Sequence, residues 1–254
     1  MDREIRRRKI VGFSIRKIIS AAILLCAAVL LAACADSDTG GDKGGNAYEN
    51  RTDTPEIRAL RPQAGHGDVK AQYSLGLIYD EGRGVAQNYA RAARWYRMAA
   101  IQGHAPAQFK LGSMSQKGLG VPQDSIAAMG WHRKAAEQGH ATAQYNLGSM
   151  YHKGAAILQN FALAARWYRQ AAEQGDPRAQ LELGLLYARG DGVRKDLLEA
   201  YKWINLASAM APLGETRSLS TKARNFLERR MSRPEITKSQ RLSRDWMTQR
   251  RAKK

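Results

Sequence analysis

The stretch AQYSLGLIYDEGRGVAQNYARAARWYRMAA, residues 71–100, recurs three more times along this chain of 254 residues, each time 36 residues further on. Alanine, glutamine, leucine, glycine and tryptophan stand at the same places in every copy. A fixed period of this length is typical of stacked units of secondary structure, each too small to bury its own apolar face. The sequence therefore predicts a repeat array.

Each copy is predicted to fold as two helices. In the first copy Ala71, Leu75 and Ile78 follow one another at steps of 4 and 3 residues, which places them on one helical face. Gly82 then ends the first helix, because glycine adopts the left-handed conformation of a C-cap without steric cost. The second helices are expected to begin at side chains that cap free backbone N–H groups, namely Asn88, Asp124, Asn160 and Asp196.

Two further residue types recur inside the helices. A glycine within a helix costs about 1 kcal/mol relative to alanine, so its presence in every copy predicts that the second helix crosses the first closely, with no room for a Cβ atom. These glycines are Gly76, Gly112, Gly148 and Gly184. The tryptophans lie at helical spacing from alanines, and we expect them to form the buried spine of the second helices. They are Trp95, Trp131, Trp167 and Trp203.

The copies share Ala-x-x-x-Leu-Gly-x-x-Tyr, then Gly-x-Gly-Val, then Ala-x-x-Trp-Tyr-x-x-Ala-Ala. Over about residues 60–210 these motifs resemble the Sel1-like repeats, relatives of the tetratricopeptide repeat with a longer turn between the helices. The resemblance implies an all-α fold, an α-solenoid of four 36-residue helix-turn-helix repeats with capping helices, and a role in protein–protein interaction. Departures at Ser115, His132, Ala156 and Ile204 affect local geometry rather than the fold.

The four repeats are expected to span residues 68–213 between two caps. Residues 55–67 resemble the degenerate half-repeat that commonly precedes a Sel1-like array. In residues 214–254 the period fades, yet segments 215–231 and 235–249 remain compatible with helices. We expect these helices to cover the apolar face of the last repeat, because terminal units of an array must be atypical to stay soluble.

The first 34 residues have the charge pattern of an export signal. Seven lysines and arginines against two acids precede an uncharged apolar run, residues 18–33. This run of 16 residues is shorter than the roughly 20 that span a bilayer as a helix. It leads into LAAC, residues 31–34, which resembles the lipoprotein box of bacteria. The resemblance implies a signal peptide over 1–34 and lipidation of Cys34. The alternative is an uncleaved anchor in which Cys34 is only a small apolar residue.

Residues 35–54 are rich in Asp, Gly, Ser and Asn, and we expect a flexible tether there. Cys26 lies in the segment to be removed, so the mature chain could form no internal disulfide. Ala35 follows the lipidated position, and in Gram-negative lipoproteins a residue other than aspartate there usually permits transfer to the outer membrane. We therefore expect an exported, lipid-anchored protein at the outer membrane facing the periplasm. Asp36 keeps inner-membrane anchoring as the alternative.

The net charge of +18 is unevenly distributed, since residues 214–254 alone contribute +9. Such a basic chain in the cytosol would suggest a nucleic-acid partner, but an exported lipoprotein has little access to DNA, so we expect none. Anionic lipid, lipopolysaccharide, acidic glycan or an acidic protein face are the favoured counter-surfaces. The basic C-terminal tail is either a solvated end or a docking patch.

In tandem helical repeats the first helices line the concave side, and analogy with tetratricopeptide repeats predicts a partner-binding groove there. It combines an aromatic row with a basic row, which suits an extended or helical peptide bearing carboxylates. The aromatic row is Tyr73, Phe109 and Tyr145, followed by Leu181, and the basic row is Glu81, Lys117, Lys153 and Arg189. The alternative is that the aromatic residues pack between the repeats. The predicted residues, which we call the groove face, are Tyr73, Leu77, Phe109, Lys110, Ser113, Lys117, Tyr145, Asn146, Ser149, His152, Lys153, Leu181, Leu185 and Arg189.

No catalytic motif stands out. The five histidines have no local metal-ligand partners, and the Gly-x-Gly triplets follow helices rather than strands. We therefore expect neither an enzyme nor a cofactor. The leading hypothesis is a lipid-anchored scaffold that binds envelope proteins or peptides, including acidic ones. Two alternatives stay open, namely a periplasmic enzyme or accessory acting on peptidoglycan or β-lactams, and a periplasmic regulator of a membrane signalling complex.

Overall fold

The computed structural model describes residues 53–154 and 158–252. The expected signal peptide, Cys34 and nearly all of the expected tether lie outside these residues, as does Ala156 in the turn of the third repeat. The chain divides into two units after Asp53, and the second unit, Thr54–Lys254, holds all the described helices.

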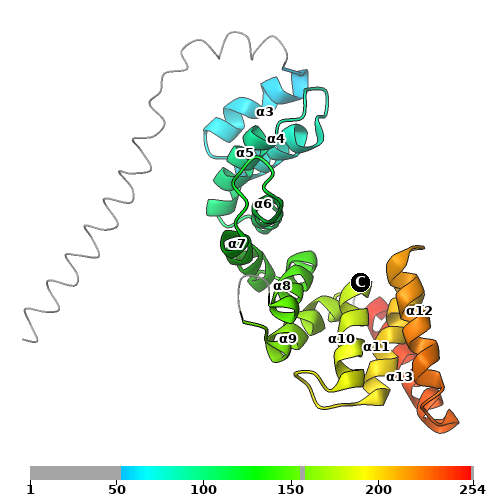
Figure 1. Cartoon of the computed structure of the whole chain (residues 1–254). Helices are drawn as coiled ribbons and strands as arrows, with labels where there is room; N and C mark the ends of the chain where they lie inside the picture. The colour runs from blue at the N-terminus through cyan, green and yellow to red at the C-terminus, as the bar shows by residue number, and fades with distance from the viewer. Residues whose placement is uncertain (1–52, 155–157, 253–254) are drawn as a thin grey trace, which may run out of the picture. The chain divides into compact units, whose positions relative to one another are not determined.

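The described residues form helices and turns, and no strand occurs among them. After α3 (Pro55–Gly65) come four helix pairs stacked in chain order (Figure 1). The pairs are α4 (Val69–Glu81) with α5 (Tyr89–Ile101), α6 (Ala105–Lys117) with α7 (Ser125–Glu137), α8 (Ala141–Lys153) with α9 (Phe161–Glu173), and α10 (Pro177–Arg189) with α11 (Leu197–Met210). The predicted all-α solenoid of four helix-turn-helix repeats is confirmed.

The predicted helix ends are confirmed in each repeat. The side chain of Asn88 accepts a hydrogen bond from the backbone N–H of Arg91 at 2.9 Å, and Asp124, Asn160 and Asp196 cap α7, α9 and α11 in the same way. The first helices end at glycines in the left-handed region, with φ of 69° at Gly82 and 86° at Gly190. Each turn therefore starts from the same backbone geometry.

The glycine inside each first helix allows the second helix to pack against it. A Cβ atom on Gly76 would lie 2.5 Å from the ring of Tyr96, and one on Gly184 would lie 2.6 Å from Ile204. Contacts this short force a neighbour to move. The predicted close crossing is confirmed.

The prediction of a buried tryptophan spine is wrong for three of the four repeats. Trp95, Trp131 and Trp167 are only half-buried, whereas Trp203 is 4% exposed. The spine is formed by the next residue in each repeat, which meets the glycine and is fully or almost fully buried: Tyr96, His132, Tyr168 and Ile204. A step of one residue turns a helix by about 100°, so each tryptophan lies at the edge of the interface. Trp203 is covered because Trp246 of α13 packs against it, with ring centroids 6.0 Å apart.

Buried glutamines link consecutive repeats through hydrogen bonds. Gln108 donates to the carbonyl of Ala100 at 3.0 Å, and its Oε1 accepts from Gln138 at 2.8 Å. The same pattern recurs at Gln72 and Gln144. These bonds satisfy polar groups that would otherwise be buried at a cost. The sequence showed this glutamine row but not its role.

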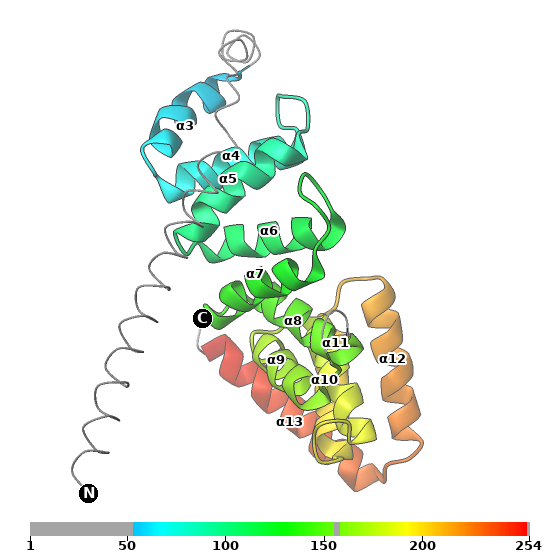
Figure 2. The same cartoon turned by 60° about the vertical axis from the view of Figure 1, so that its left-hand side comes forward.

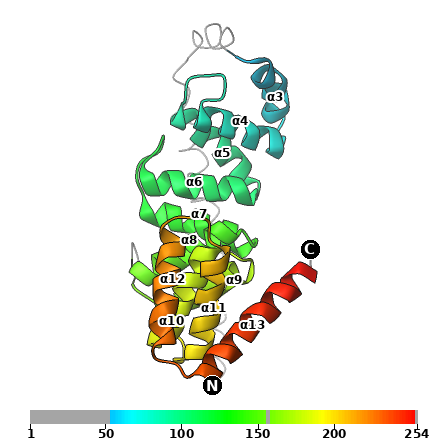
Figure 3. The ribbon, with the colours of Figure 1, turned by 90° about the vertical axis from the view of Figure 1, so that its right-hand side faces the viewer.

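Two helices close the C-terminal end of the array. Both α12 (Glu215–Glu228) and α13 (Arg233–Ala252) pack on α11, and α12 also contacts α10 (Figures 2 and 3). Leu227 and Met231 complete an apolar cluster with Leu181, Tyr201 and Ile204. Within the described residues, no helix combines the length and the apolar character that crossing a membrane requires.

Candidate protein-binding surface

The groove face comes entirely from the first helices of the repeats, α4, α6, α8 and α10. Most of its side chains are half-buried or exposed, but Leu181 is only 5% exposed. Leu181 belongs to the cluster that joins α10 to α11 and α12. It therefore offers a partner no surface, and the aromatic row ends at Tyr145.

The aromatic row lies at the joints between repeats. The ring of Tyr73 is 4.7 Å from that of His104, and Phe109 stacks on His140 at 4.6 Å, where His104 and His140 are the N-caps of α6 and α8. Burial lowers the pKa of both histidines, which favours the neutral ring in these contacts. Part of each aromatic surface is thus used within the array, and only the remaining edge is open to a partner.

The third aromatic residue is covered by a cation. The guanidinium carbon of Arg178 lies 4.4 Å from the ring centroid of Tyr145, and the same guanidinium forms an ion pair with Asp176 at 2.6 Å. Tyr145 therefore has its ring face occupied. Its pKa is raised by burial, and the nearby carboxylate of Glu182 adds to that rise.

The basic row is open to solvent. Lys117, Lys153 and Arg189 are exposed, and none of them has an ion-pair partner among the described residues. At the first position of the row Glu81 is paired with Arg83 at 3.1 Å. The unpaired positive charge of this row therefore begins at the second repeat.

Lys110, in contrast, is neutralised within the array. Its Nζ lies 2.9 Å from Oδ2 of Asp80, and the hydroxyl of Tyr96 donates to the same oxygen at 3.0 Å. Burial and the adjacent carboxylate raise the pKa of Tyr96, so its hydroxyl stays protonated as the donor. Lys110 thus joins the first two repeats and is not free to bind a partner.

The third and fourth repeats carry the same contact with the acid and the base exchanged. Nδ1 of His152 lies 3.6 Å from Oε2 of Glu182, and the hydroxyl of Tyr168 is 3.4 Å from the same nitrogen. His152 and Glu182 are the equivalents of Asp80 and Lys110. In the intermediate repeat Asn146 stands at the position of Lys110 and is half-buried.

The remaining small and apolar residues of the groove face form its floor. Leu77 of α4 packs on the first apolar cluster, and Ser113 of α6 and Ser149 of α8 are half-buried. The hydroxyl of Ser113 donates to the carbonyl of Phe109 at 3.0 Å, so it is already satisfied. Leu185 continues this line into a pocket at the end of the array.

That pocket, which we call the end pocket, lies between α10, α11 and α12 and has a volume of about 440 Å³. The groove-face residues Leu185 and Arg189 line it together with side chains of α12. The groove face predicted from the sequence includes the α10 residues of this pocket, Leu185 and Arg189. The α12 residues were not predicted, because that helix lies outside the 36-residue period.

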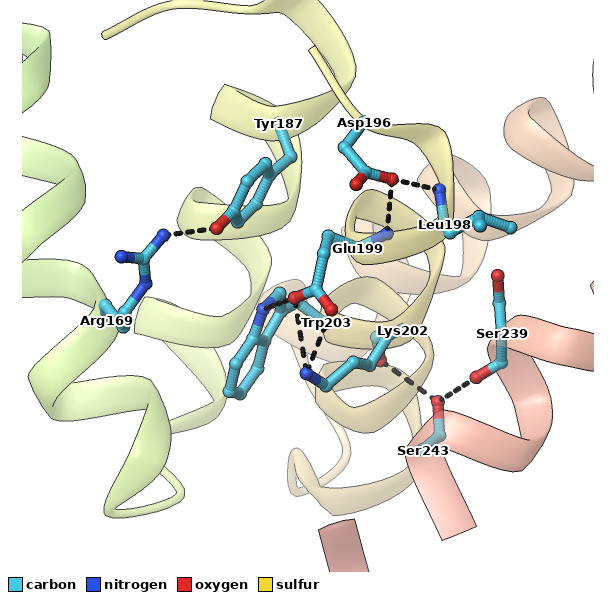
Figure 4. Close-up of polar contacts among 9 residues, drawn as sticks. All are labelled: Arg169, Tyr187, Asp196, Leu198, Glu199, Lys202, Trp203, Ser239 and Ser243. Carbon is cyan, nitrogen blue, oxygen red and sulfur yellow. Dashed lines mark hydrogen bonds and ion pairs between the residues drawn. The ribbon is translucent and has the colours of Figure 1, made fainter. Parts of the chain in front are cut away.

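A polar cluster fixes α13 to the array (Figure 4). Glu199 accepts hydrogen bonds from Nε1 of Trp203 at 2.9 Å and from Nζ of Lys202 at 3.2 Å. The hydroxyl of Ser243 on α13 donates to the carbonyl of Lys202 at 3.3 Å. These groups satisfy one another, so the cluster serves the packing of α11 and α13. The spacing of its acid, lysine and tryptophan on one helical face was visible in the sequence.

In residues 53–154 and 158–252 no group of three His, Cys, Asp or Glu side chains is placed to hold a metal ion. His132 is fully buried, and burial lowers its pKa to about 4. Neither ring nitrogen of His132 has a hydrogen-bond partner in the part of the chain that the structure describes.

Fold and surface together define a helical-repeat protein whose candidate binding face carries non-repeating side chains. The family model described as Sel1 repeat matches four consecutive segments, residues 69–104, 105–140, 141–176 and 177–211. The chain therefore belongs to the Sel1 repeat family. Proteins of this family are generally scaffolds for protein–protein interaction rather than enzymes.

The solved structures that are similar to this chain include the following two. A Sel1 repeat protein from Oxalobacter formigenes is 32% identical with a TM-score of 0.61, and the match covers 76% of this chain and 78% of that one. The protein c5321, described as a protective antigen of uropathogenic Escherichia coli strains displaying an SLR fold, is 28% identical with a TM-score of 0.50. That match covers 76% of this chain but 48% of c5321. No match is found among curated proteins.

Proposed function

We propose that this protein is a lipid-anchored adaptor of the bacterial cell envelope that binds a protein partner along the groove face. The observation that carries the binding role is the row of Lys117, Lys153 and Arg189, three exposed cations without ion-pair partners among the described residues. Consecutive repeats hold them at equivalent positions, and Lys117 and Lys153 lie about two helical turns after the partly open rings of Phe109 and Tyr145. An extended acidic segment would find charge and apolar contact along one line.

The envelope location rests on the sequence of the first 34 residues. The basic segment, the apolar run and the LAAC motif support lipidation of Cys34, and the Asp/Gly-rich stretch after it would let the array reach away from the lipid surface. The outer membrane, facing the periplasm, is the proposed site, with the inner membrane as the alternative.

Replacing the cysteine tests this location. We expect Cys34→Ser to abolish incorporation of labelled fatty acid and to release the protein into the soluble fraction of an envelope preparation. Replacement of Cys26 by serine is the matched control and should leave labelling unchanged. Unchanged labelling and membrane attachment of the Cys34 variant would overturn the proposal.

Charge reversal in the basic row tests the binding role. We expect Lys117→Glu with Lys153→Glu to abolish the capture of crosslinked partners from native envelopes. The matched control, Arg97→Glu with Arg166→Glu, makes the same change in net charge at exposed positions on α5 and α9. Circular dichroism should show equal helix content in both. Undiminished capture by the first variant would place the binding site elsewhere.

The proposed adaptor has no catalytic step. Purified protein is expected to leave peptidoglycan and β-lactams unchanged, and turnover of either would favour the cell-wall enzyme over the adaptor. A membrane signalling protein as the captured partner would assign the chain the more specific role of a regulator.

A further inference from the structure

The end pocket is enclosed by a first helix, a second helix and a C-terminal helix, whereas the groove face is formed by first helices alone. Leu185 and Ala188 come from α10, Ile204 from α11, and Ala223 and Leu227 from α12. Its volume of about 440 Å³ lies within the range of ligand pockets, roughly 300–1,000 Å³. The pocket is therefore large enough to receive an apolar side chain of a partner.

Three cations stand around this apolar interior. Arg189 ends α10, Lys195 lies in the turn before α11, and Arg230 follows α12. All three are exposed, and none has an ion-pair partner among the described residues. No acidic residue is among the described residues that line the pocket. A ligand that enters the pocket therefore meets three positively charged side chains, one from each of three segments of the chain.

An exposed aromatic ring stands at the entrance. Phe226 is 51% exposed, and the guanidinium carbon of Arg230 lies 4.0 Å from its ring centroid. Leu219, two helical turns earlier on α12, is 46% exposed and lies on the same side of the helix. Both side chains extend the apolar surface outward from the pocket, and a bound segment would remove them from water.

We propose that the end pocket anchors an acidic partner segment, with one large apolar side chain inserted and neighbouring carboxylates on Arg189, Lys195 and Arg230. This inference rests on the proposed protein-binding function. Arginine pairs with carboxylates through two parallel hydrogen bonds, which fixes the direction of the bound segment. Because Leu185 and Arg189 also belong to the groove face, the segment continues from the pocket along α10.

A peptide fits this site better than a membrane does. An anionic bilayer favours a flat basic face that follows its surface, as on an amphipathic helix lying in the interface. Here the cations surround a concave apolar pocket and come from three separate elements. That arrangement matches one inserted side chain flanked by acids.

The test uses the full chain purified in detergent and a fluorescein-labelled dodecapeptide of alternating Glu and Leu with one central Phe. Fluorescence anisotropy should show binding that weakens with salt. We expect Lys195→Glu with Arg230→Glu to weaken binding by about tenfold or more, because two attractive charges become repulsive. Ala223→Trp, which fills the pocket without changing its charge, should weaken it comparably. The control pair Arg97→Glu with Arg166→Glu should bind within about twofold of the unchanged protein.

Four results would overturn the inference. The pocket variants could bind the peptide normally, or the control pair could lose as much affinity as they do. The unchanged protein could prefer phosphatidylglycerol vesicles, with that binding lost in the Lys195/Arg230 variant, which would assign a lipid surface. Light scattering could show a dimer that only the pocket variants dissociate, which would assign a second copy of this chain.

The assay also separates this inference from the proposed function. The anisotropy measurement uses protein in detergent and no bilayer. Its result therefore does not depend on the outcome of the lipidation test at Cys34. Partner capture that depends on Lys117 and Lys153 but not on Lys195 and Arg230 would keep the adaptor role and overturn the end pocket alone.

Discussion

The first and the last joints of the array use the same helix arrangement for different purposes. At the first joint, between α4 and α6, Lys110 neutralises Asp80, which also accepts a hydrogen bond from Tyr96. At the last joint, between α10 and α12, Arg189, Lys195 and Arg230 have no such partners among the described residues. The repeated positions therefore determine the packing, while the non-repeated positions decide whether a joint is closed or open to a ligand.

The largest expected effect comes from breaking the packing that both ends share. Gly76→Val and Gly184→Val should each lower the free energy of unfolding by about 3 kcal/mol, because the new side chain would overlap Tyr96 or Ile204. Urea denaturation followed by circular dichroism measures this loss. Gly130→Val, at an exposed helical glycine where an added Cβ would meet no other side chain within 4 Å, should change stability by less than about 0.5 kcal/mol. Equal tolerance at all three positions would contradict the close crossing.

A second prediction concerns the repeat between the two ends, where His132 replaces the spine tyrosine. Burial, with a smaller contribution from His140, lowers the pKa of His132 from 6.5 to about 4. The unfolded chain therefore takes up the proton first as pH falls. Stability should be unaffected by this group above pH 6.5 and should decrease by roughly 3 kcal/mol between pH 6.5 and 4.

The variant His132→Tyr isolates this effect, since tyrosine occupies the equivalent position in Tyr96 and Tyr168 and does not titrate in that range. His104 and His140 also have lowered pKa values, so the difference between the two proteins is the quantity to measure. Parallel stability curves from pH 7 to pH 4 would show that His132 is not the source.

A smaller effect is expected from the closed joint itself. Lys110→Glu would bring a second carboxylate to Asp80 and should cost about 1–2 kcal/mol. Adding Asp80→His creates the arrangement of His152 and Glu182 and should restore most of the loss. A double-mutant cycle in urea measures the coupling. Simple additivity of the two changes would show that the exchanged arrangement is not equivalent.

The smallest expected effect concerns Gln180, the last residue of the buried glutamine row. Met210 stands where the other repeats have Gln102, Gln138 and Gln174, and Oε1 of Gln180 has no hydrogen-bond partner among the described residues. Met210→Gln should supply the missing donor and raise the free energy of unfolding by about 1 kcal/mol. Met98→Gln, at an exposed position on α5, is the control. A loss of stability in the first variant would mean that packing against Arg250 outweighs the new hydrogen bond.

The period predicted the fold, but it could not decide which of two adjacent large residues faces inward. Trp95 and Tyr96 are both apolar enough for the interface between the two helices. The structure shows that Tyr96 is the one that packs against Gly76. The groove face was predictable as a set of equivalent positions. The sequence did not show which of the cations on this face are unpaired, because Lys110 is neutralised by Asp80, a residue 30 positions earlier. The end pocket depends on α12, whose sequence lacks the period.

The exchanged charges at the joints make the order of the repeats matter. Removing residues 105–176, two full periods, would preserve the helix arrangement but bring Glu182 opposite Asp80, so two carboxylates would meet where a pair now forms. Removing 105–140 alone would set Asn146 there, a neutral and tolerable neighbour. Loss or duplication of repeats in the gene is therefore constrained by side-chain complementarity at the joints. Arrays of this chain with the repeats in another order should differ in stability, although every repeat keeps the same backbone.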